Sequence, residues 1–372
     1  MDGLFYNLIR LSIGNDNILS YYPSAKEWGY LYKLANKQSL QGVCFAGVRK
    51  CMEKAYSEGC DPGIPHNLYM QWLASAVRIQ RQNELMNQRC MELQSNLSSI
   101  GQRSTILKGQ AIASLYNVDE MLEDMPLSEL RQPGDIDVYV DCGREKSIDI
   151  ARTLGQQDID WDYKHLHLHV FPDAEVEMHY RPEVLLNLLK NRRLQQWFAQ
   201  EETLRELFCQ QGDFVAPSLD FNLFYILLHI YRHFLYEGVG LRQLMDYLFV
   251  LKTVDSQTDF RWSKQAIESF GMKRFARGVM WIMLHVFGLE NQFLLYEPDE
   301  KEGRYILDQV MTGGNFGHHD ERLKANGKHL DKLGTVKKIL KHNLHLLAHY
   351  PKEVIWAPVW IVYHWCWKKC RR

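Results

Sequence analysis

The chain has 372 residues, of which 46% are hydrophobic and 24% are charged, and its formal net charge at pH 7 is −1. This length and composition are typical of an ordinary globular protein with two or three packed units. A net charge so close to zero excludes a broadly basic nucleic-acid-binding surface, although a local basic groove is compatible with it.

The cysteines and the N-terminus favour a reduced, cytoplasmic protein. Eight cysteines are scattered along the chain and no two form a Cys-x-x-Cys pair, so the usual spacing of a structural zinc site is absent. The N-terminal sequence MDGLFYNLIRLSIGND lacks the basic start and the small-residue cleavage site of a secretory signal. We therefore predict a cytoplasmic location, where thiols stay reduced.

The sequence does not predict a transmembrane segment. No apolar run reaches the ~20 residues that a membrane span requires. The C-terminal segment 354–372, VIWAPVWIVYHWCWKKCRR, is aromatic and carries four basic residues near its end, which is compatible with a peripheral membrane contact. A buried terminal helix is the interpretation that we prefer.

The first hundred residues are predicted to be helical. In segments 24–48 and 66–101, apolar residues recur at intervals of three and four, which is the period of a helix with one buried face. Gly101 is expected to end the second of these segments.

After residue 101 the pattern changes to that of a small α/β core. β-branched residues, alternation and turn residues mark its elements. In chain order these are a strand at 104–107 (STIL), a tight turn into a helix at 108–116 (KGQAIASLY), a polar acidic insertion at 118–129, a strand within 134–140 (GDIDVYV), a helix at 143–156, and a hairpin of HLHLHVF and EVEMHY around Pro172-Asp173-Ala174.

From Pro182 onward the helical period returns over most of the chain. The sequence therefore predicts an α+β fold with a small mixed-sheet core. The core, residues 101–182, is flanked by an N-terminal helical region, residues 1–100, and by a C-terminal helical domain, residues 183–372.

Acidic residues at the start of two predicted strands suggest a metal site. Asp135 and Asp137 are two positions apart, so in a strand they share a face and their like charges disfavour each other. Such pairs are common by chance and mean little alone. The strand EVEMHY adds Glu175, Glu177 and His179 on one face, so three carboxylates are expected to converge. Oxygen ligands of this kind favour Mg²⁺ or Mn²⁺ over Zn²⁺.

The stretches LKGQAIASLY, RQPGDIDVYV and VEMHYRP together resemble the nucleotidyltransferase superfamily of the polymerase-β type. Within it they are most similar to a poorly characterised bacterial branch with an LKG motif and a Gly-Asp-Ile-Asp strand. The resemblance implies transfer of a nucleoside monophosphate from an NTP, ATP among them, to an acceptor hydroxyl. Pyrophosphate would leave, and two Mg²⁺ ions, or Mn²⁺, would support the displacement.

The resemblance also implies roles for individual residues. Asp135, Asp137 and Glu177 would be catalytic and would bind the metal ions, with Glu177 preferred over Glu175 as the third carboxylate and as acceptor of the substrate's proton. The nucleotide-binding residues that it implies are Lys108, Gly109, Gly134, Arg131 and Arg242.

Two departures from the superfamily pattern keep other functions open. Gly109 is followed by Gln110, where the superfamily has Gly-Ser or Gly-Gly, and the acidic insertion lengthens the interval from Gly109 to Asp135. A second hypothesis is therefore a catalytically weak module that binds a nucleotide or a partner. A third is a toxin-like enzyme that modifies RNA or protein. The acceptor stays open among small molecules, proteins and RNA.

Three histidines, His165, His167 and His169, alternate on one predicted strand face. Alternating histidines are compatible with a zinc site. No carboxylate or cysteine is evident in the sequence to complete a tetrahedral ligand set. We therefore interpret this face as lining a polar cleft or meeting solvent.

The helices predicted downstream carry two further pairs of polar residues four positions apart. His229 and His233 either face the nucleotide cleft or are buried and hydrogen-bonded, and the glutamate that a metalloprotease needs between them is missing. Arg242 and Asp246 either pair on the helix surface or leave Arg242 to contact phosphate.

Overall fold

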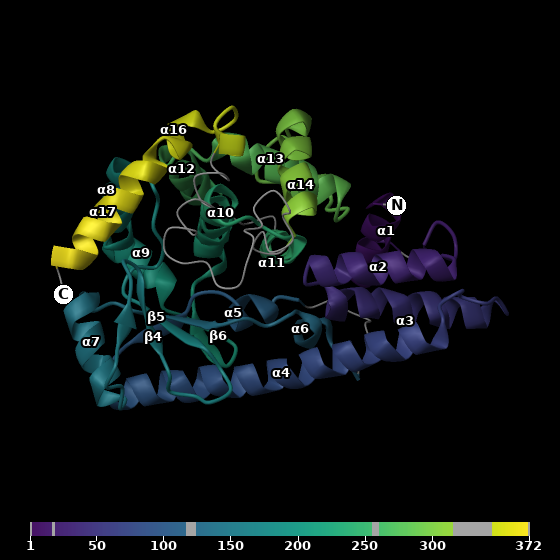
Figure 1. Cartoon of the computed structure of the whole chain (residues 1–372), viewed down its shortest axis with the longest axis horizontal. Helices are drawn as coiled ribbons and strands as arrows, with labels where there is room; N and C mark the ends of the chain where they lie inside the picture. The colour runs from purple at the N-terminus through teal and green to yellow at the C-terminus, as the bar shows by residue number, and fades with distance from the viewer. Residues whose placement is uncertain (1, 17–18, 117–123, 255–259, 315–343, 371–372) are drawn as a thin grey trace.

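The computed structural model describes residues 2–16, 19–116, 124–254, 260–314 and 344–370. Within these residues the chain has an α+β fold, with a small mixed sheet in the middle and helices at both ends (Figure 1). The predicted fold class is therefore confirmed. Of the predicted acidic insertion, residues 118–123 lie outside the described part of the chain.

The helices that precede the sheet are α1 (Asp2–Ser12), α2 (Ala25–Lys37), α3 (Gln41–Ser57) and α4 (His66–Ser99). The periodic segment 24–48 contains α2 and the first part of α3, and Ser39 between them adopts the left-handed region at φ 54°. Ser24 caps α2 in a capping box with Glu27. α4 ends just before Gly101, which has φ 73°, as predicted for a helix stop.

Five described strands pair in the order β1-β2-β5-β4-β3. They are β1 (Ser104–Ile106), β2 (Ile136–Val140), β3 (Asp160–Trp161), β4 (His165–Leu168) and β5 (Val176–His179). β2 and β5 are parallel, and the other neighbours, including the predicted hairpin of β4 and β5, are antiparallel. Asp137 of β2 is paired with Glu177 of β5, so both side chains project from one face of the sheet.

The sheet has an apolar face and a polar face. Val138, Leu166 and Met178 project from the apolar face into a core that they share with α4 and with α7 (Gly143–Thr153). Figure 1 shows α4 running along the sheet and continuing beneath the N-terminal helices. The polar face, which carries Asp137 and Glu177, is turned toward the C-terminal helices.

Most of the chain after the sheet is helical, as predicted. The helices are α8 (Leu188–Phe198), α9 (Glu201–Leu207), α10 (Leu219–Tyr236), α11 (Leu241–Lys252), α12 (Arg261–Ser269), α13 (Lys273–His285), η1 (Asn291–Phe293), α14 (Glu300–Gly313), α16 (Pro351–Val354) and α17 (Trp356–Cys370). α10 and α11 are buried along almost their whole length and belong to the same core as the N-terminal helices. Figure 1 places them on the side of the sheet opposite α4.

One hairpin in this region was not predicted. It consists of β6 (Cys209–Gln211) and β7 (Phe214–Ala216), with Gly212 at φ 58° in the turn. Gln94 of α4 holds it in place, because its side chain donates to the Val215 carbonyl at 2.8 Å and accepts from the Val215 amide at 3.0 Å. The Cys-Gln-Gln of β6 lacks the β-branched and aromatic residues that mark a strand in a sequence, whereas the equally short β1 contains Thr105 and Ile106.

The C-terminal helix α17 is buried on one face only. Trp360 and Trp367 pack edge-on against Tyr163, beside the end of β3. Val359, Val362 and Trp365 remain exposed, so the preferred interpretation of a buried terminal helix holds for one face. None of the helices in the described ranges combines the length and the apolarity that crossing a membrane requires.

Candidate active site

The structure brings the three predicted carboxylates together on the polar face of the sheet. Asp137 and Glu177 face each other across β2 and β5, and Asp135 directly precedes β2. One oxygen from each of the three lies within 4.8 Å of the others. Glu175 is exposed and contributes its backbone carbonyl to the Ile136 amide, so Glu177 is the carboxylate that joins the cluster.

Lys108 supplies a positive charge to this cluster. Its Nζ forms an ion pair with Asp137 Oδ2 and lies 4.0 Å from Asp135 Oδ1. The lysine is positioned by the end of β1, where the Leu107 amide donates to the Asp137 carbonyl at 2.9 Å. One ammonium group therefore offsets part of the negative charge of the two aspartates, whose proximity is otherwise unfavourable.

The charges in the cluster shift the pKa values of the two aspartates in opposite directions. Repulsion from Asp137 raises the pKa of Asp135, against the opposing effect of Lys108. Burial raises the pKa of Asp137, but Lys108 and the hydrogen bond to His179 outweigh it, and the net shift is downward. Burial also lowers the pKa of Lys108, while Asp135, Asp137 and Glu177 raise it by more. Asp137 and Lys108 are therefore both charged at neutral pH.

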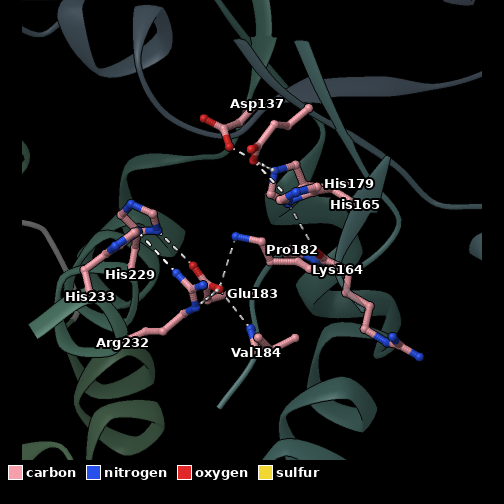
Figure 2. Close-up of polar contacts among 12 residues, drawn as sticks. Asp137, Lys164, His165, His179, Pro182, Glu183, Val184, His229, Arg232 and His233 are labelled. Carbon is pink, nitrogen blue, oxygen red and sulfur yellow. Dashed lines mark hydrogen bonds and ion pairs between the residues drawn. The ribbon is translucent and has the colours of Figure 1, made fainter. Parts of the chain in front are cut away.

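Two histidines also contact the carboxylates (Figure 2). His179 Nε2 lies 2.9 Å from Asp137 Oδ1 and 3.4 Å from Glu177 Oε2. His165 Nδ1 lies 3.0 Å from Glu177 Oε2. Burial raises the pKa of Glu177, but the hydrogen bond from His179 and the charges of both histidines lower it to about 2. The carboxylate beside the β4 histidines that was not evident in the sequence is Glu177, because the register places it opposite His167.

Gly109 allows the chain to turn from β1 into the short helix α5 (Gln110–Ala113). Its φ is 65°, a conformation that favours glycine, and a Cβ there would lie 3.6 Å from the Asp135 carbonyl oxygen. α5 has a single turn, so its dipole is weaker than the predicted helix would provide. Gln110 is buried and donates to Asn87 Oδ1 of α4 at 2.6 Å. The unusual glutamine therefore fixes α5 to α4.

The two predicted nucleotide-binding arginines have different partners. Arg131 forms a buried bidentate ion pair with Asp246, at 2.7 and 2.8 Å, and Tyr116 also donates to Asp246 at 2.7 Å. Arg242 donates from Nη1 to the Gln132 carbonyl at 2.8 Å. Burial and repulsion from Arg131 lower the pKa of Arg242. Of the two alternatives for Arg242 and Asp246, pairing on the helix surface is wrong, because both residues are buried.

One pocket joins the aspartates to all five predicted nucleotide-binding residues. Its lining residues are Lys108, Gly109, Arg131, Gly134, Asp135, Asp137, Ile226, His229, Ile230, Arg242, Gln243 and Asp246. The backbone turn at Gly109 and the side chains of α10 and α11 therefore enclose the same space as the two aspartates. A pocket with convergent polar groups and charged side chains with shifted pKa values is the expected form of a binding site.

The comparison with known families agrees with this geometry. A family described as uncharacterised nucleotidyltransferase matches residues 24–288, which is more than half of the chain. The chain belongs to this family. The matched residues include the sheet, the carboxylate cluster and the part of α10 and α11 that lines the pocket. Searches against curated proteins and against solved structures gave no significant match.

The carboxylate cluster of this family member has the donor set of a divalent-cation site. Asp135, Asp137 and Glu177 offer oxygen ligands, which Mg²⁺ and Mn²⁺ prefer. The Lys108 ammonium beside Asp135 and Asp137 indicates that a positive charge is stabilised at this point. These three carboxylates are therefore the residues that would hold such an ion.

A second polar cluster lies beside the pocket and was not predicted (Figure 2). Glu183 is fully buried, and His229 Nδ1 of α10 lies 2.8 Å from its Oε2. Lys164 Nζ and Arg232 Nε lie 3.6 and 3.4 Å from its Oε1. Burial raises the pKa of Glu183, but these partners hold it well below its usual value. Both alternatives for His229 therefore hold, because it lines the pocket and is also buried and hydrogen-bonded.

Proposed function

We propose that the protein is a divalent-metal-dependent nucleotidyltransferase that moves a nucleoside monophosphate from an NTP to an acceptor hydroxyl and releases pyrophosphate. The observation that carries the proposal is the convergence of Asp135, Asp137 and Glu177 next to a pocket lined by basic residues. Membership of a nucleotidyltransferase family supports the general reaction.

The three carboxylates are proposed to hold Mg²⁺, or Mn²⁺. Bound there, the ion would neutralise phosphate charge and orient the reacting oxygens of an in-line displacement. Glu177 is proposed to bind the ion because one of its oxygens lies within 4.8 Å of oxygens of both aspartates.

Arg242 is the residue that we propose for phosphate binding. Arg131 is held by Asp246 in a bidentate pair, so its charge is already balanced. Arg242 is buried next to Arg131, and burial, together with repulsion from Arg131, lowers its pKa. An anion in the pocket would relieve this repulsion. Lys108 and Gly109 lie on the same pocket wall, where an ammonium group and a close backbone approach favour a triphosphate.

A transfer assay tests the proposal. Wild type and Asp137→Asn are incubated with Mg²⁺ or Mn²⁺, each α-labelled NTP in turn, and a fractionated lysate that supplies acceptors. We expect wild type to transfer label, and Asp137→Asn to lose transfer while remaining folded. Asp141→Asn is the matched control, because Asp141 lies just after the same strand but is exposed and accepts a hydrogen bond from Tyr139. The labelled product would identify the acceptor as a small molecule, protein or RNA.

A catalytically weak binding module is the second candidate. The observation that favours it is the Lys108 ammonium between Asp135 and Asp137, where it competes with a metal ion. Tight binding of an NTP with Mg²⁺, without pyrophosphate release in the presence of any acceptor fraction, would establish this function and contradict the transferase.

A further inference from the structure

Three potential metal ligands meet on β4 and β5, beside the carboxylate cluster. They are His165 Nδ1, His179 Nε2 and Glu177 Oε2, and all lie within 4.8 Å of one another. Glu177 Oε2 is 3.0 Å from His165 Nδ1 and 3.4 Å from His179 Nε2. The antiparallel register pairs His165 with His179, so the sheet itself fixes their separation. Both histidines are buried.

The 3.4 Å separation of Glu177 Oε2 and His179 Nε2 matches that between two ligands of one metal ion, and the 3.0 Å separation of Glu177 Oε2 and His165 Nδ1 is slightly shorter. Metal–nitrogen and metal–oxygen bonds of ~2.0–2.2 Å in a tetrahedral site separate neighbouring ligand atoms by about 3.3–3.5 Å. His165 Nδ1 is buried and makes no hydrogen bond within the described structure, although Glu177 Oε2 is only 3.0 Å away. A ring nitrogen directed at a carboxylate oxygen without a hydrogen bond is placed as a ligand would be.

The remaining ring nitrogen of each histidine has an outer partner. His179 Nδ1 lies 3.4 Å from the Arg181 carbonyl oxygen, and His165 Nε2 lies 3.7 Å from Asp162 Oδ2. Metal-binding histidines commonly have their second nitrogen directed at a carbonyl or carboxylate, which fixes the ring orientation and the tautomer. With Nδ1 of His179 directed at Arg181, its Nε2 faces Glu177 and also lies 2.9 Å from Asp137 Oδ1, a hydrogen bond that it would exchange for the metal ion.

We infer that His165, Glu177 and His179 form a second metal site, which takes a transition-metal dication such as Mn²⁺, Co²⁺ or Zn²⁺. Two imidazoles and one carboxylate suit these ions, whereas Mg²⁺ prefers oxygen ligands. Glu177 is common to this site and to the carboxylate cluster, so it is placed to bridge two ions. The inference rests on the proposed function in one respect only, namely that Mg²⁺ occupies the neighbouring carboxylate cluster.

The test is a titration with Co²⁺ in excess Mg²⁺, followed by the visible absorption of the bound Co²⁺. Wild type is expected to bind one Co²⁺ at this site. His165→Gln and His179→Gln are each expected to weaken binding by at least ~100-fold, the upper end of what loss of an outer partner costs. His169→Gln is the control, because His169 lies just beyond β4 and is exposed, and it should bind Co²⁺ like wild type. Unchanged affinity in both of the first two variants would overturn the site.

A spectroscopic measurement on wild type covers the case in which a variant does not fold. X-ray absorption of the Zn²⁺-loaded protein should show scattering from two imidazole rings and no sulfur. Sulfur ligation, or the absence of imidazole, would overturn the site.

Asp135→Asn separates the inference from the proposed function. Asp135 belongs to the carboxylate cluster but not to the histidine set, so this variant should lose nucleotide transfer and keep Co²⁺. Wild type that binds Co²⁺ through imidazole but transfers no nucleotide would retain the metal site and reject the transferase. If wild type transfers nucleotide with Mg²⁺ but does not bind Co²⁺ through imidazole, the transferase is retained and the second metal site is rejected.

Discussion

Lys108 and Asp137 form an ion pair at the pocket in which the lysine side chain is 18% exposed and the aspartate side chain 1%. The aspartate therefore depends on its partners for compensation of its charge, whereas the lysine can reach solvent. This inequality implies that the lysine can leave the pair when another cation arrives.

The Lys108→Met variant tests this relationship. Without metal we expect it to lose about 3 kcal/mol of stability, the lower end of the cost of removing one member of a buried ion pair, because His179 still contacts Asp137. Mg²⁺ should then raise the melting temperature of the variant by more than it raises that of wild type. Thermal denaturation with and without Mg²⁺ measures both effects. Lys146→Met on the exposed side of α7 is the control. If Mg²⁺ raises the melting temperature equally in wild type and in both variants, Mg²⁺ does not take the place of the Lys108 ammonium.

The lowered pKa of Glu177 predicts how the free energy of unfolding depends on pH. Its pKa is about 2 in the folded chain and roughly 4.3 when unfolded. Its contribution is therefore present above pH ~4.3 and is lost as the pH falls toward 2. Glu177→Gln should remove up to about 3 kcal/mol of this dependence, the free-energy equivalent of the shift. Metal-free urea denaturation between pH 5 and 2 measures it.

Glu175→Gln is the matched control for this experiment. Glu175 lies two residues earlier and is exposed, so its substitution should leave the acid dependence of wild type unchanged. If both variants follow the wild-type curve, the contacts of Glu177 with His165 and His179 do not lower its pKa.

Residues that share a face by strand alternation could be predicted from the sequence. The two-residue spacing in GDIDVYV places Asp135 and Asp137 on the same face of one strand, and the spacing in EVEMHY places Glu177 and His179 on the same face of another. Because β2 pairs with β5, these residues lie on one face of the sheet. The same alternation in HLHLHVF was a usable signal for His165. The sequence does not show that Glu177 lies beside these histidines, because the register that places Glu177 opposite β4 is a property of the folded sheet.

Contacts that depend on long-range packing could not be predicted. Arg131 and Asp246 are 115 residues apart in the chain, and no local pattern relates them. Glu183 follows the sheet without any periodic signal, and its partners come from α10 and from the loop before β4. The Lys108–Asp137 pair depends on how far a flexible side chain reaches across β1 and β2.

The two arginines of the pocket should respond differently to substitution. Arg131→Met leaves Asp246 buried without its bidentate partner, and removal of one member of a buried pair costs about 3–5 kcal/mol. Arg242→Met removes a hydrogen bond to the Gln132 carbonyl, which costs ~1 kcal/mol. We therefore expect Arg131→Met to unfold at much lower urea, and Arg242→Met to stay folded.

Nucleotide binding completes this comparison. Arg242→Met should weaken NTP binding by at least tenfold, because a charge-assisted contact to phosphate is worth more than about 1.4 kcal/mol. Isothermal titration with a non-hydrolysable NTP analogue and Mg²⁺ measures it. Unchanged affinity in Arg242→Met would remove this arginine from the phosphate site, whatever the stability of Arg131→Met.

Gly109→Ala separates backbone strain from nucleotide binding. The φ of 65° at Gly109 is unfavourable for alanine, and residues forced into such conformations cost about 1–3 kcal/mol. Gly143 has φ 73° at the start of α7, with open space where a Cβ would lie, so Gly143→Ala introduces comparable strain away from the pocket.

Both variants should lose stability in urea, because both must strain or rearrange the backbone. Only Gly109→Ala should also lose NTP affinity, since its turn precedes α5 and carries Lys108 on the pocket wall. Equal NTP affinity in the two variants would show that the turn at Gly109 shapes the fold and not the nucleotide site.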